Sequence, residues 1–391
     1  MKRYSSQYTI TNAGNVLKRA IITVDNEGRV TDIEDTGGDL KETESIEFYN
    51  GIIVPGFVNC HCHLELSHLR NLIPPKTGLH RFIEGIRNKR IIEEKKIITA
   101  ARAEDSYMFK GGISACADIC NNSSTFAIKQ SSAIKYINLI EVFGIDPVKA
   151  QKRMGEALSL ASQAKKMNLF YQITPHSAYS VSPDLFNILK QNTAGNKISS
   201  IHFLESPYER EFLENHTGPI IESYIRSGLI CEDFRTVSNS VEAVMNYMPL
   251  SGNLILVHNT FVSNNDIEIL KKRNKLFYCL CPNSNIFIEN KLPPLQLLLD
   301  NGCEIVIGTD SLASNRSLSI IDELKTLQFS FPELNIPDLI KWATVNGARA
   351  LGIENEFGII EKGRKPGLLL LEGVDLQKLK LTDDSSVTRL V

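Results

Sequence analysis

The sequence predicts an α/β protein, a (β/α)8 TIM barrel with a small β-sandwich domain built from both chain ends. From residue 57 onward, short apolar runs rich in β-branched residues alternate with amphipathic stretches. Eight such runs are present, and eight parallel strand and helix units close a barrel. Both ends of the chain carry the alternating pattern of antiparallel strands instead.

The N-terminal segment, residues 1–54, is expected to form antiparallel strands. Residues 20–24 and 29–33 read as two strands, and Asn26-Glu27-Gly28 between them is a turn sequence, which together predict a hairpin. Near the other end, the apolar run 368–371 is again strand-like. We therefore expect a composite β-sandwich domain from residues 1–54 and 355–391, and a catalytic barrel from residues 55–354.

The barrel strands are expected where the apolar runs lie, at residues 57–61, 113–119, 135–141, 169–174, 199–203, 253–257, 276–281 and 304–308. Helical periodicity lies between them, for example from Phe82 to Ile98 and from Ile320 to Leu327. Continuous apolar strands separated by helices are typical of a parallel sheet covered by helices. A doubly wound open sheet is the alternative, but the glycine-rich phosphate loop of its nucleotide-binding form does not follow the first strand.

Composition and charge exclude several classes of protein. The chain has 391 residues, of which 42% are hydrophobic and 23% are charged, as in ordinary globular proteins. Its net charge of -2 lacks the basic excess of a nucleic-acid-binding protein. The polar N-terminus lacks an apolar signal core, and apolar runs long enough to span a bilayer are absent. We expect a cytoplasmic protein with a small-molecule substrate, no nucleic acid or membrane partner, and possible assembly as a homo-oligomer.

The eight cysteines are dispersed along the chain, which favours reduced thiols over disulfides. Two pairs, Cys60/Cys62 and Cys279/Cys281, have Cys-x-Cys spacing within strand-like runs. These cysteines are expected to pack in the core and not to bind a metal.

Polar side chains follow the predicted strands at the rim where barrels place reactive groups, the C-terminal ends. His61 and His63 end the first strand, and their spacing puts both on one face. His176 follows the fourth strand, whereas His202, His258 and Asp310 end the fifth, sixth and eighth. Five of the eight histidines therefore lie at one rim, and packing alone gives a histidine no such preference. The pattern predicts a metal site.

Three histidines and one aspartate suit Zn²⁺, which lowers the pKa of a bound water to about 7. The fourth strand carries no lysine that, carbamylated, would bridge two metals, so one ion is expected. Fe²⁺ and Mn²⁺ suit the same ligand types.

The motifs at these positions resemble those of the amidohydrolase superfamily, over nearly the whole chain. Within it, the sequence is most similar to metal-dependent deaminases of S-adenosylhomocysteine, methylthioadenosine and aminofutalosine, and to their chlorohydrolase relatives. The resemblance rests on His61-Cys-His63, His202-x-x-Glu205, Val257-His258, Gly308-Thr-Asp310-Ser-x-Ala-Ser-Asn315, Pro175-His176-Ser-x-Tyr179, Ala343-Thr-x-Asn-Gly-Ala-Arg-Ala-Leu351 and Gly358-x-Ile-Glu-x-Gly-x-x-Pro-Gly367.

The resemblance implies the role of each site residue. The metal ligands would be His61, His63, His202 and Asp310. Asp310 would also accept a proton from the water, and Glu205 would deliver one to the substrate ring, where hydroxide addition to C6 places charge on N1. His258 would lie beside the water and, with Asp310, relay a proton to the departing ammonia. Glu205 must then be protonated before attack, a form that burial favours.

The implied reaction is hydrolytic deamination of a 6-aminopurine nucleoside derivative, aminofutalosine-, adenosine- or S-adenosylhomocysteine-like, with release of ammonia. Guanine deamination, dechlorination and cyclic-amide hydrolysis are alternatives on the same fold. A catalytically silent binding barrel is an alternative of another class, which metal content would separate from the enzymes.

Substrate identity is expected to depend on the loops at residues 64–90 and 205–220. The sequence after His63, Leu64-Glu65-Leu66-Ser67, is more similar to aminofutalosine deaminases than to the Ala-Pro-Met type of the other groups. The candidate substrate contacts are His176, Glu205, Glu65 and Glu84, with Glu84 the nearest acidic residue for ribose hydroxyls. Arg87 or Arg90 would meet an acidic substituent such as a benzoate, or would be surface charges.

Overall fold

The structure is a computed structural model that describes residues 1–41, 45–231 and 233–391. Eight of its strands form two four-stranded parallel sheets. Their starts and ends lie within two residues of the predicted ones, the largest difference being 169 against Tyr171. The strands are β6 (Phe57–Cys62), β7 (Ile113–Cys120), β8 (Lys135–Val142) and β9 (Tyr171–Pro175) in one sheet, and β10 (Ile198–Phe203), β11 (Asn253–His258), β12 (Leu276–Leu280) and β13 (Glu304–Ile307) in the other.

The two parallel sheets are linked along both pairs of edges by isolated bridges. On one side Cys62 pairs with Asp310, and the backbone N–H groups of Thr309 and Asp310 both donate to the His61 carbonyl at 3.0 Å. On the other side Ser177 pairs with His202. The arrangement is therefore of the TIM-barrel type, and the closure of one continuous eight-stranded barrel stays a prediction.

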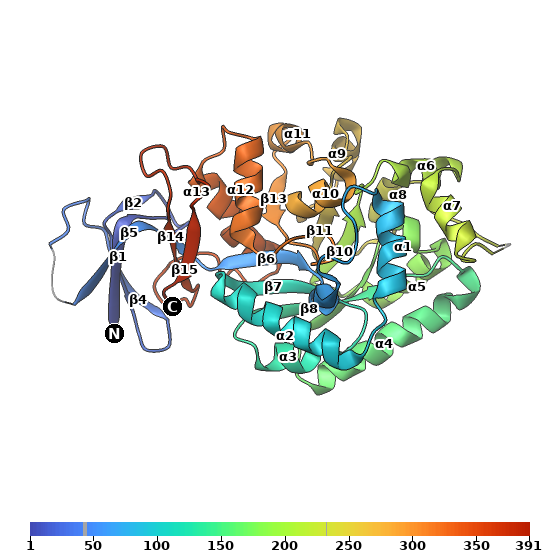
Figure 1. Cartoon of the computed structure of the whole chain (residues 1–391), viewed down its shortest axis with the longest axis horizontal. Coiled ribbons are helices and arrows are strands. Elements are labelled where there is room, and N and C mark those ends of the chain that lie inside the picture. The colour runs from blue at the N-terminus through green and yellow to red at the C-terminus, as the bar shows by residue number, and fades with distance from the viewer. Residues whose placement is uncertain (42–44, 232) are drawn as a thin grey trace.

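Helices follow most of the parallel strands and surround the two sheets in Figure 1. The helix expected at Ile320–Leu327 lies within α12, where the Ser319 hydroxyl caps the N-terminus by accepting from Asp322 N–H. The helices are α1 (Leu79–Lys89), α2 (Glu94–Lys110), α3 (Phe126–Ser131), α4 (Ala150–Lys166), α5 (Pro183–Thr193), α6 (Tyr208–Asn215), α7 (Pro219–Arg226), α8 (Ser240–Tyr247), α9 (Asn264–Leu270), α10 (Pro282–Glu289), α11 (Leu295–Asp300), α12 (Ile320–Ser330), α13 (Ile336–Lys341) and α14 (Gly347–Ala350).

The expected helical run from Phe82 to Ile98 is wrong as one element. Helix α1 ends at Lys89, and α2 begins at Glu94. The guanidinium of Arg90, the C-cap residue, turns toward Asn121 and Glu65, and the backbone of Glu93 is extended. Helix α1 therefore ends next to a residue, Arg90, whose side chain makes tertiary contacts. The apolar spacing alone predicts that the helix continues.

The two chain ends meet in one seven-stranded sheet, beside the two parallel sheets in Figure 1. The predicted hairpin is confirmed as β3 and β4, with Asp25 Oδ1 accepting the N–H groups of Glu27 and Arg29 in its turn. Strands β1 and β5 pair in parallel, so the expectation of purely antiparallel strands is wrong. The β-sandwich stays a prediction. The strands are β1 (Lys2–Thr9), β2 (Leu17–Lys18), β3 (Ile21–Val24), β4 (Val30–Glu34), β5 (Ile46–Pro55), β14 (Leu368–Glu372) and β15 (Ser386–Arg389).

Small and branched side chains from the parallel strands form a buried core that includes Val58, Cys60, Ala117 and Cys279. Both Cys-x-Cys pairs are buried as predicted, and all eight cysteines are free thiols. Gly308 is required beside this core, because a Cβ there would lie 2.8 Å from both Cys279 Sγ and His61 Cβ. Close packing thus fixes the chain just before Asp310. Among the described helices, none is both long and apolar enough to cross a membrane.

Candidate active site

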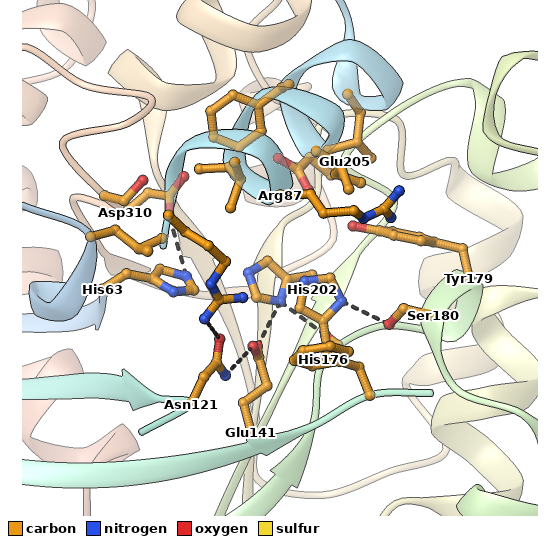
Figure 2. A pocket seen from close by; sticks show the side chains of 18 of the residues that line it. His63, Arg87, Asn121, Glu141, His176, Tyr179, Ser180, His202, Glu205 and Asp310 are labelled. Carbon is orange, nitrogen blue, oxygen red and sulfur yellow. Dashed lines mark hydrogen bonds and ion pairs between the residues drawn. The ribbon is translucent and has the colours of Figure 1, made fainter. Parts of the chain in front are cut away.

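The ionisable residues expected at the strand ends gather around one pocket. His61 lies at the end of β6 and His63 follows that strand, His202 and His258 lie at the ends of β10 and β11, and Asp310 follows β13. Figure 2 shows side chains from several elements pointing into the pocket. The lining residues are His63, Leu66, Leu79, Phe82, Ile83, Ile86, Arg87, Arg90, Asn121, Glu141, Phe143, His176, Tyr179, Ser180, His202, Glu205, Tyr224, His258, Asp310 and Ser311.

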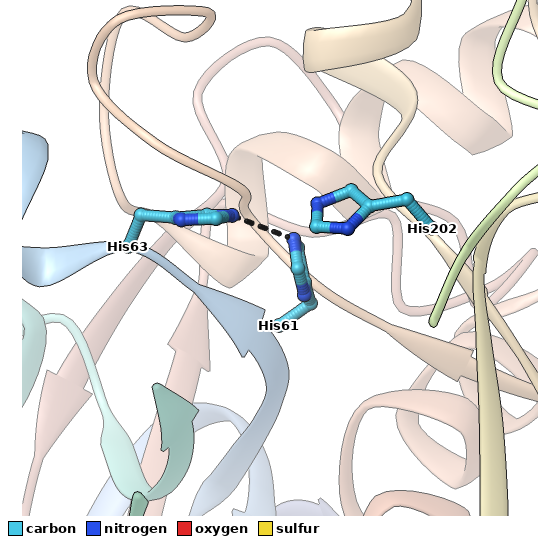
Figure 3. Close-up of side chains that lie close together, drawn as sticks. All are labelled: His61, His63 and His202. Atoms are coloured by element: carbon cyan, nitrogen blue, oxygen red, sulfur yellow. Dashed lines mark hydrogen bonds between the residues drawn. The ribbon is translucent and has the colours of Figure 1, made fainter. Parts of the chain in front are cut away.

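Three histidines lie together at this pocket, His63 and His202 in its lining and His61 next to them. The ligand nitrogens of His61, His63 and His202 all lie within 4.8 Å of one another, and the three rings face a common point in Figure 3. His61 Nε2 is 3.1 Å from His63 Nε2. Asp310 Oδ1 lies 3.4 Å from His63 Nε2 and 3.6 Å from His61 Nε2. The structure thus brings together the four residues expected as metal ligands.

The spacing of His61, His63 and Asp310 fits a divalent cation. Ligands on a tetrahedral zinc at 2.0–2.1 Å are roughly 3.3 Å apart, close to the separations among His61, His63 and Asp310. His202 Nδ1 donates to the His176 carbonyl at 2.9 Å, which leaves Nε2 as the free ligand nitrogen. Burial lowers the pKa of His63 and His202 well below the usual value. Neutral imidazoles at neutral pH therefore offer their lone pairs to a cation.

Asp310 is prepared as an anionic ligand by its neighbours. Its Oδ2 accepts hydrogen bonds from the hydroxyls of Ser284 and Ser314, both at 2.6 Å, so Oδ1 is the oxygen that faces the histidines. Burial opposes ionisation, but the hydrogen bond to His61 and the nearby His63 and His258 outweigh it and hold the pKa of Asp310 well below its usual range.

The backbone is strained where the strands end. Leu204, His258 and Asp310 have φ values of 47°, 79° and 55°, in the left-handed region that non-glycine residues seldom adopt. Such conformations cost about 1–3 kcal/mol each and persist where the surrounding structure fixes them. The strain coincides with the chain segments that carry the polar side chains of the pocket.

Glu205 is a buried acid beside the ligand cluster. Its side chain is 4% exposed, and its Oε1 lies 3.5 Å from His258 Nε2. The Glu209 carboxylate accepts the backbone N–H groups of Leu204 and Glu205, which fixes the turn that aims Glu205. Burial, then repulsion from Asp310 and Glu209, raises the pKa of Glu205 well above its usual value. The structure thus favours the protonated form expected from the sequence.

The Nε2 nitrogen of His258 faces Glu205. The Asn285 side-chain amide donates to His258 Nδ1 at 3.1 Å, so the proton of the neutral ring resides on Nε2. Burial lowers the pKa of His258 well below the usual value, which keeps the ring neutral. His258 therefore presents an N–H to the pocket, next to the Glu205 carboxyl.

Glu141 is a pocket residue that sequence reasoning missed. Its Oε2 accepts from the Asn121 amide at 3.0 Å, whereas its buried Oε1 has no hydrogen-bond partner among the described residues and lies 3.6 Å from His202 Nδ1. Glu141 lies in β8, near its C-terminal end, so the strand-end rule that found the histidines also applied to it. Ligand atoms of Glu141, His176 and His202 also lie within 4.8 Å of one another. Because His202 Nδ1 already donates to the His176 carbonyl, this second group is poorly suited to a second cation.

His176 lies in the pocket but outside the ligand triad. Its Nδ1 contacts the Ser177 and Ser180 hydroxyls, and its ring stacks on His202 with centroids 4.5 Å apart. Burial lowers the pKa of His176 to about 3. A neutral ring at the wall fits the expected contact with substrate, which stays a prediction.

Two acidic residues expected to contact the substrate, Glu84 and Glu65, lie outside the pocket lining. Glu84 is absent from the pocket lining, and its carboxylate pairs with Arg226 of α7 at 2.8 Å. Glu65 is buried behind the lining, where it holds Arg90 at 3.4 Å and accepts the Asn121 N–H at 3.0 Å. The expectation that Glu84 contacts substrate is therefore corrected, and Glu65 supports the wall from behind.

Helix geometry explains the difference between Glu84 and the arginines. Ile83, Ile86, Arg87 and Arg90 follow the i, i+3, i+4, i+7 spacing of one helical face, and all four line the pocket. Glu84 lies on another face of α1. The rotation of α1 about its axis is a tertiary property that the local sequence did not define.

The comparisons of this sequence and structure with known proteins agree with one another. The model of the amidohydrolase family matches residues 52–390. A 5'-deoxyadenosine deaminase of Methanobrevibacter smithii is 26% identical over 387 residues, which cover 91% of this chain and 80% of the relative. The structure of Helicobacter pylori aminofutalosine deaminase in complex with methylthio-coformycin is 21% identical, with a TM-score of 0.80 and coverage of 98% of this chain and 94% of that one. An adenosine deaminase from Xanthomonas campestris with bound zinc is 19% identical, with a TM-score of 0.70 and coverage of 95% and 84%.

Proposed function

The chain belongs to the amidohydrolase family, and from this premise we propose that it is a hydrolytic deaminase of a 6-aminopurine nucleoside derivative. The observation that carries the proposal is the position of the Glu205 carboxyl, which is buried next to His258 and the cluster of His61, His63, His202 and Asp310 and whose pKa burial raises well above its usual value. Relatives named as deaminases of adenine nucleosides support it.

We propose that His61, His63, His202 and Asp310 hold one divalent cation, Zn²⁺ before Fe²⁺ or Mn²⁺. Their separations and the free Nε2 of His202 support this assignment. When bound, the cation supplies a water of lowered pKa in the pocket. The zinc in the Xanthomonas campestris structure supports the choice of metal.

Three side chains of the protein each carry out one part of the proton transfer. Glu205 donates its proton to the ring nitrogen N1, which gains electron density as water adds to C6. Asp310, held ionised by its surroundings, accepts a proton from the water. His258 presents Nε2–H to the same region and, with Asp310, passes a proton to the leaving ammonia. His176 and Glu141 lie on the wall where they would hydrogen-bond the nucleoside.

The proposal is tested by a substrate panel assayed for ammonia release. Adenosine, 5'-deoxyadenosine, 5'-methylthioadenosine, S-adenosylhomocysteine and guanine would each be incubated with zinc-loaded protein. We expect ammonia and the 6-oxo product from at least one adenine nucleoside, and none from guanine. Activity with guanine alone would replace the proposal with another reaction, and inactivity of protein carrying zinc toward the whole panel would contradict it.

We also propose the division of the chain into a catalytic domain, residues 55–354, and a composite domain, residues 1–54 and 355–391. The pairing of β5 with β14 supports the composite domain, because it joins the two chain ends in one sheet. The bridges at both sheet edges support a closed barrel. Eight free cysteines support a reducing compartment such as the cytoplasm.

A further inference from the structure

A second cavity lies next to the segments that hold Asp310. Its volume is about 500 Å³, in the range of small-molecule sites, and among the described residues it shares no lining residue with the candidate active site. It is formed by α10 and α12, which pack against each other, and by residues 75–76 and 315–317. The loop after β6 is tied to α10 here, because the backbone N–H of Lys76 donates to the carbonyl of Phe287.

The place of this cavity in the fold is one where barrels bind phosphate. Helices α10 and α12 follow β12 and β13, the seventh and eighth parallel strands along the chain. In (β/α)8 enzymes the loops after the seventh and eighth strands frequently form a phosphate site at the C-terminal rim. The position of the cavity is therefore suited to an anion.

The charged side chains of the cavity give it a net positive charge. Its lining contains three cationic side chains and one carboxylate, which are Lys76, Arg316, Lys325 and Asp322. Within the described part of the chain, neither the Lys76 ammonium nor the Arg316 guanidinium has a hydrogen-bond or ion-pair partner. The Asp322 carboxylate instead accepts from the Ser317 hydroxyl at 2.6 Å, and Lys325 donates to a backbone carbonyl at 2.8 Å. Two cations at this cavity are therefore free to bind an anion.

Aromatic side chains line the same cavity. Phe287 of α10 and Phe329 of α12 both lie in its wall, and Ile286 adds further apolar surface. Phe329 is 50% exposed, so its ring is available to a ligand. A flat ring placed against these side chains would bury apolar surface and stack on an aromatic face. The cavity thus combines unpaired positive charge with a surface suited to a planar group.

The wall of this cavity and the orientation of Asp310 depend on the same two segments. Asn283 and Asn315 line the cavity, and both donate to the buried carboxylate of Glu323, at 2.9 and 2.6 Å. The serine next to each asparagine in the chain donates its hydroxyl to Asp310 Oδ2 at 2.6 Å. A ligand in the cavity would therefore contact the segments that orient Asp310.

We infer that this cavity binds a phosphate monoester carried by a flat ring, such as a nucleoside monophosphate, as an effector separate from the reacting nucleoside. Arg316 and Lys76 bind the phosphate, because the planar fork of arginine matches two phosphate oxygens and the lysine supplies a second charge. Phe287 and Phe329 contact the ring. By holding the two asparagine segments, the bound ligand steadies Asp310 and raises the rate of the chemical step. Binding is independent of the proposed function, and only the effect on the rate rests on it.

Calorimetry with uridine 5'-monophosphate tests the binding, because this nucleotide has no 6-amino group to lose. Uridine and ribose 5-phosphate are the matched controls, since one lacks the charge and the other lacks the ring. We expect zinc-loaded protein to bind the nucleotide at least about tenfold more tightly than either control. In Arg316→Met the affinity for the nucleotide should fall roughly ten- to a hundredfold, because charge-assisted hydrogen bonds are lost. Absence of nucleotide binding, or equal affinities for the three ligands, would overturn the inference.

Further variants locate the site. Lys362→Met removes an exposed cation near Asp32, outside this cavity, and controls for non-specific attraction. Arg87→Met tests the candidate active site as the alternative place of binding. Both variants should keep the wild-type affinity for uridine 5'-monophosphate. Loss of affinity in Arg87→Met with full retention in Arg316→Met would place the nucleotide in the active-site pocket and overturn the inference.

The effect on the rate is measured with the adenine nucleoside that the substrate panel identifies. Saturating uridine 5'-monophosphate should raise kcat by about fivefold or more at unchanged KM, and Arg316→Met should abolish the increase. A raised KM at constant kcat would show competition in the active-site pocket, and an unchanged or lowered kcat would overturn the link to Asp310. If zinc-loaded protein deaminates none of the panel, the proposed function fails, and the calorimetric comparison still decides whether the cavity binds the nucleotide.

Discussion

His202 illustrates how single residues are prepared for one role. Its Nδ1 donates to a backbone carbonyl, which fixes the ring and leaves Nε2 toward His61 and His63. Asp310 is oriented in the same way by two serine hydroxyls. Neighbouring groups of this kind commonly account for 10–100-fold in metal affinity, so the arrangement indicates a site organised before the cation binds.

Removing a ligand tests this organisation. In His202→Ala the cation would lose one of four ligands, so we expect the zinc content after dialysis to fall from about one ion per chain to well below half, with a matching loss of activity. Elemental analysis measures the zinc. His216→Ala, an exposed histidine that contacts Thr236, serves as the matched control and should keep its zinc. Full zinc retention in His202→Ala would refute its assignment as a ligand.

The raised pKa of Glu209 leads us to expect that the stability of the protein depends on pH. Burial raises its pKa to about 7 from the usual 4.5, so the folded protein holds this proton more tightly than the unfolded chain. Its contribution to stability is complete below about pH 4.5 and is lost as the pH rises through about 7. The difference in Tm between wild type and Glu209→Gln should therefore fall as the pH rises from 4.5 to 7.5. A difference independent of pH would show that Glu209 titrates normally.

At the scale of elements, the end of β6 is held by a buried ion pair. Asp118 of β7 accepts the backbone N–H of Leu64 at 2.7 Å, directly after His63, and its other oxygen pairs with Lys129 of α3. Both side chains are fully buried. The pair therefore connects a strand, a helix and the chain segment that carries two of the proposed ligands.

Breaking this pair on one side should be costly. Lys129→Met leaves Asp118 as an unpaired buried charge, so we expect the free energy of unfolding to fall by about 3–5 kcal/mol. The double variant Asp118→Asn with Lys129→Met removes both charges and should recover most of that loss. Urea denaturation of the two variants and the wild type measures the effect. A double variant less stable than Lys129→Met would contradict the account of the pair.

The parallel strands were predictable because each is a nearly continuous apolar run bounded by polar residues. The break between α1 and α2 was not, since it accompanies contacts of Arg90 with Asn121 and Glu65, which lie on other elements. The parallel pairing of β1 with β5 was missed for a similar reason. Alternation along a strand defines its two faces and leaves the direction of its neighbour open.

At the scale of the whole molecule, the proposed ligand set follows from one rule of the fold, that parallel strands present their C-terminal ends at one rim. His61, His202 and Asp310 were therefore placed by sequence alone. The contacts of Glu84 and Arg87 were not, because they depend on how α1 is rotated over that rim. Glu141 also lies at the end of a predicted strand, so the same rule would have placed it at the rim.

The terminal strand joins the two parts of the molecule through Arg389. Its guanidinium donates to the carbonyls of Phe109 and Ile113, next to the start of β7, and burial lowers its pKa to about 10. Arg389→Met would leave these acceptors unsatisfied, so we expect the free energy of unfolding to fall by roughly 1–3 kcal/mol. Lys365→Met breaks an exposed ion pair with Glu27 and should change the free energy of unfolding by less than about 1 kcal/mol. Equal effects in urea denaturation would contradict the role of Arg389.

The account depends most on Glu205 as the proton donor of a metal-dependent deaminase. The direct measurement compares zinc content and ammonia release in the same preparations of wild type and Glu205→Gln, with the adenine nucleoside that the panel identifies as substrate. An amide has no proton of suitable acidity, so turnover should fall about 10²–10⁴-fold while zinc stays at one ion per chain. Wild-type turnover in Glu205→Gln with zinc bound would show that the ring is protonated by another group, and the account would be wrong.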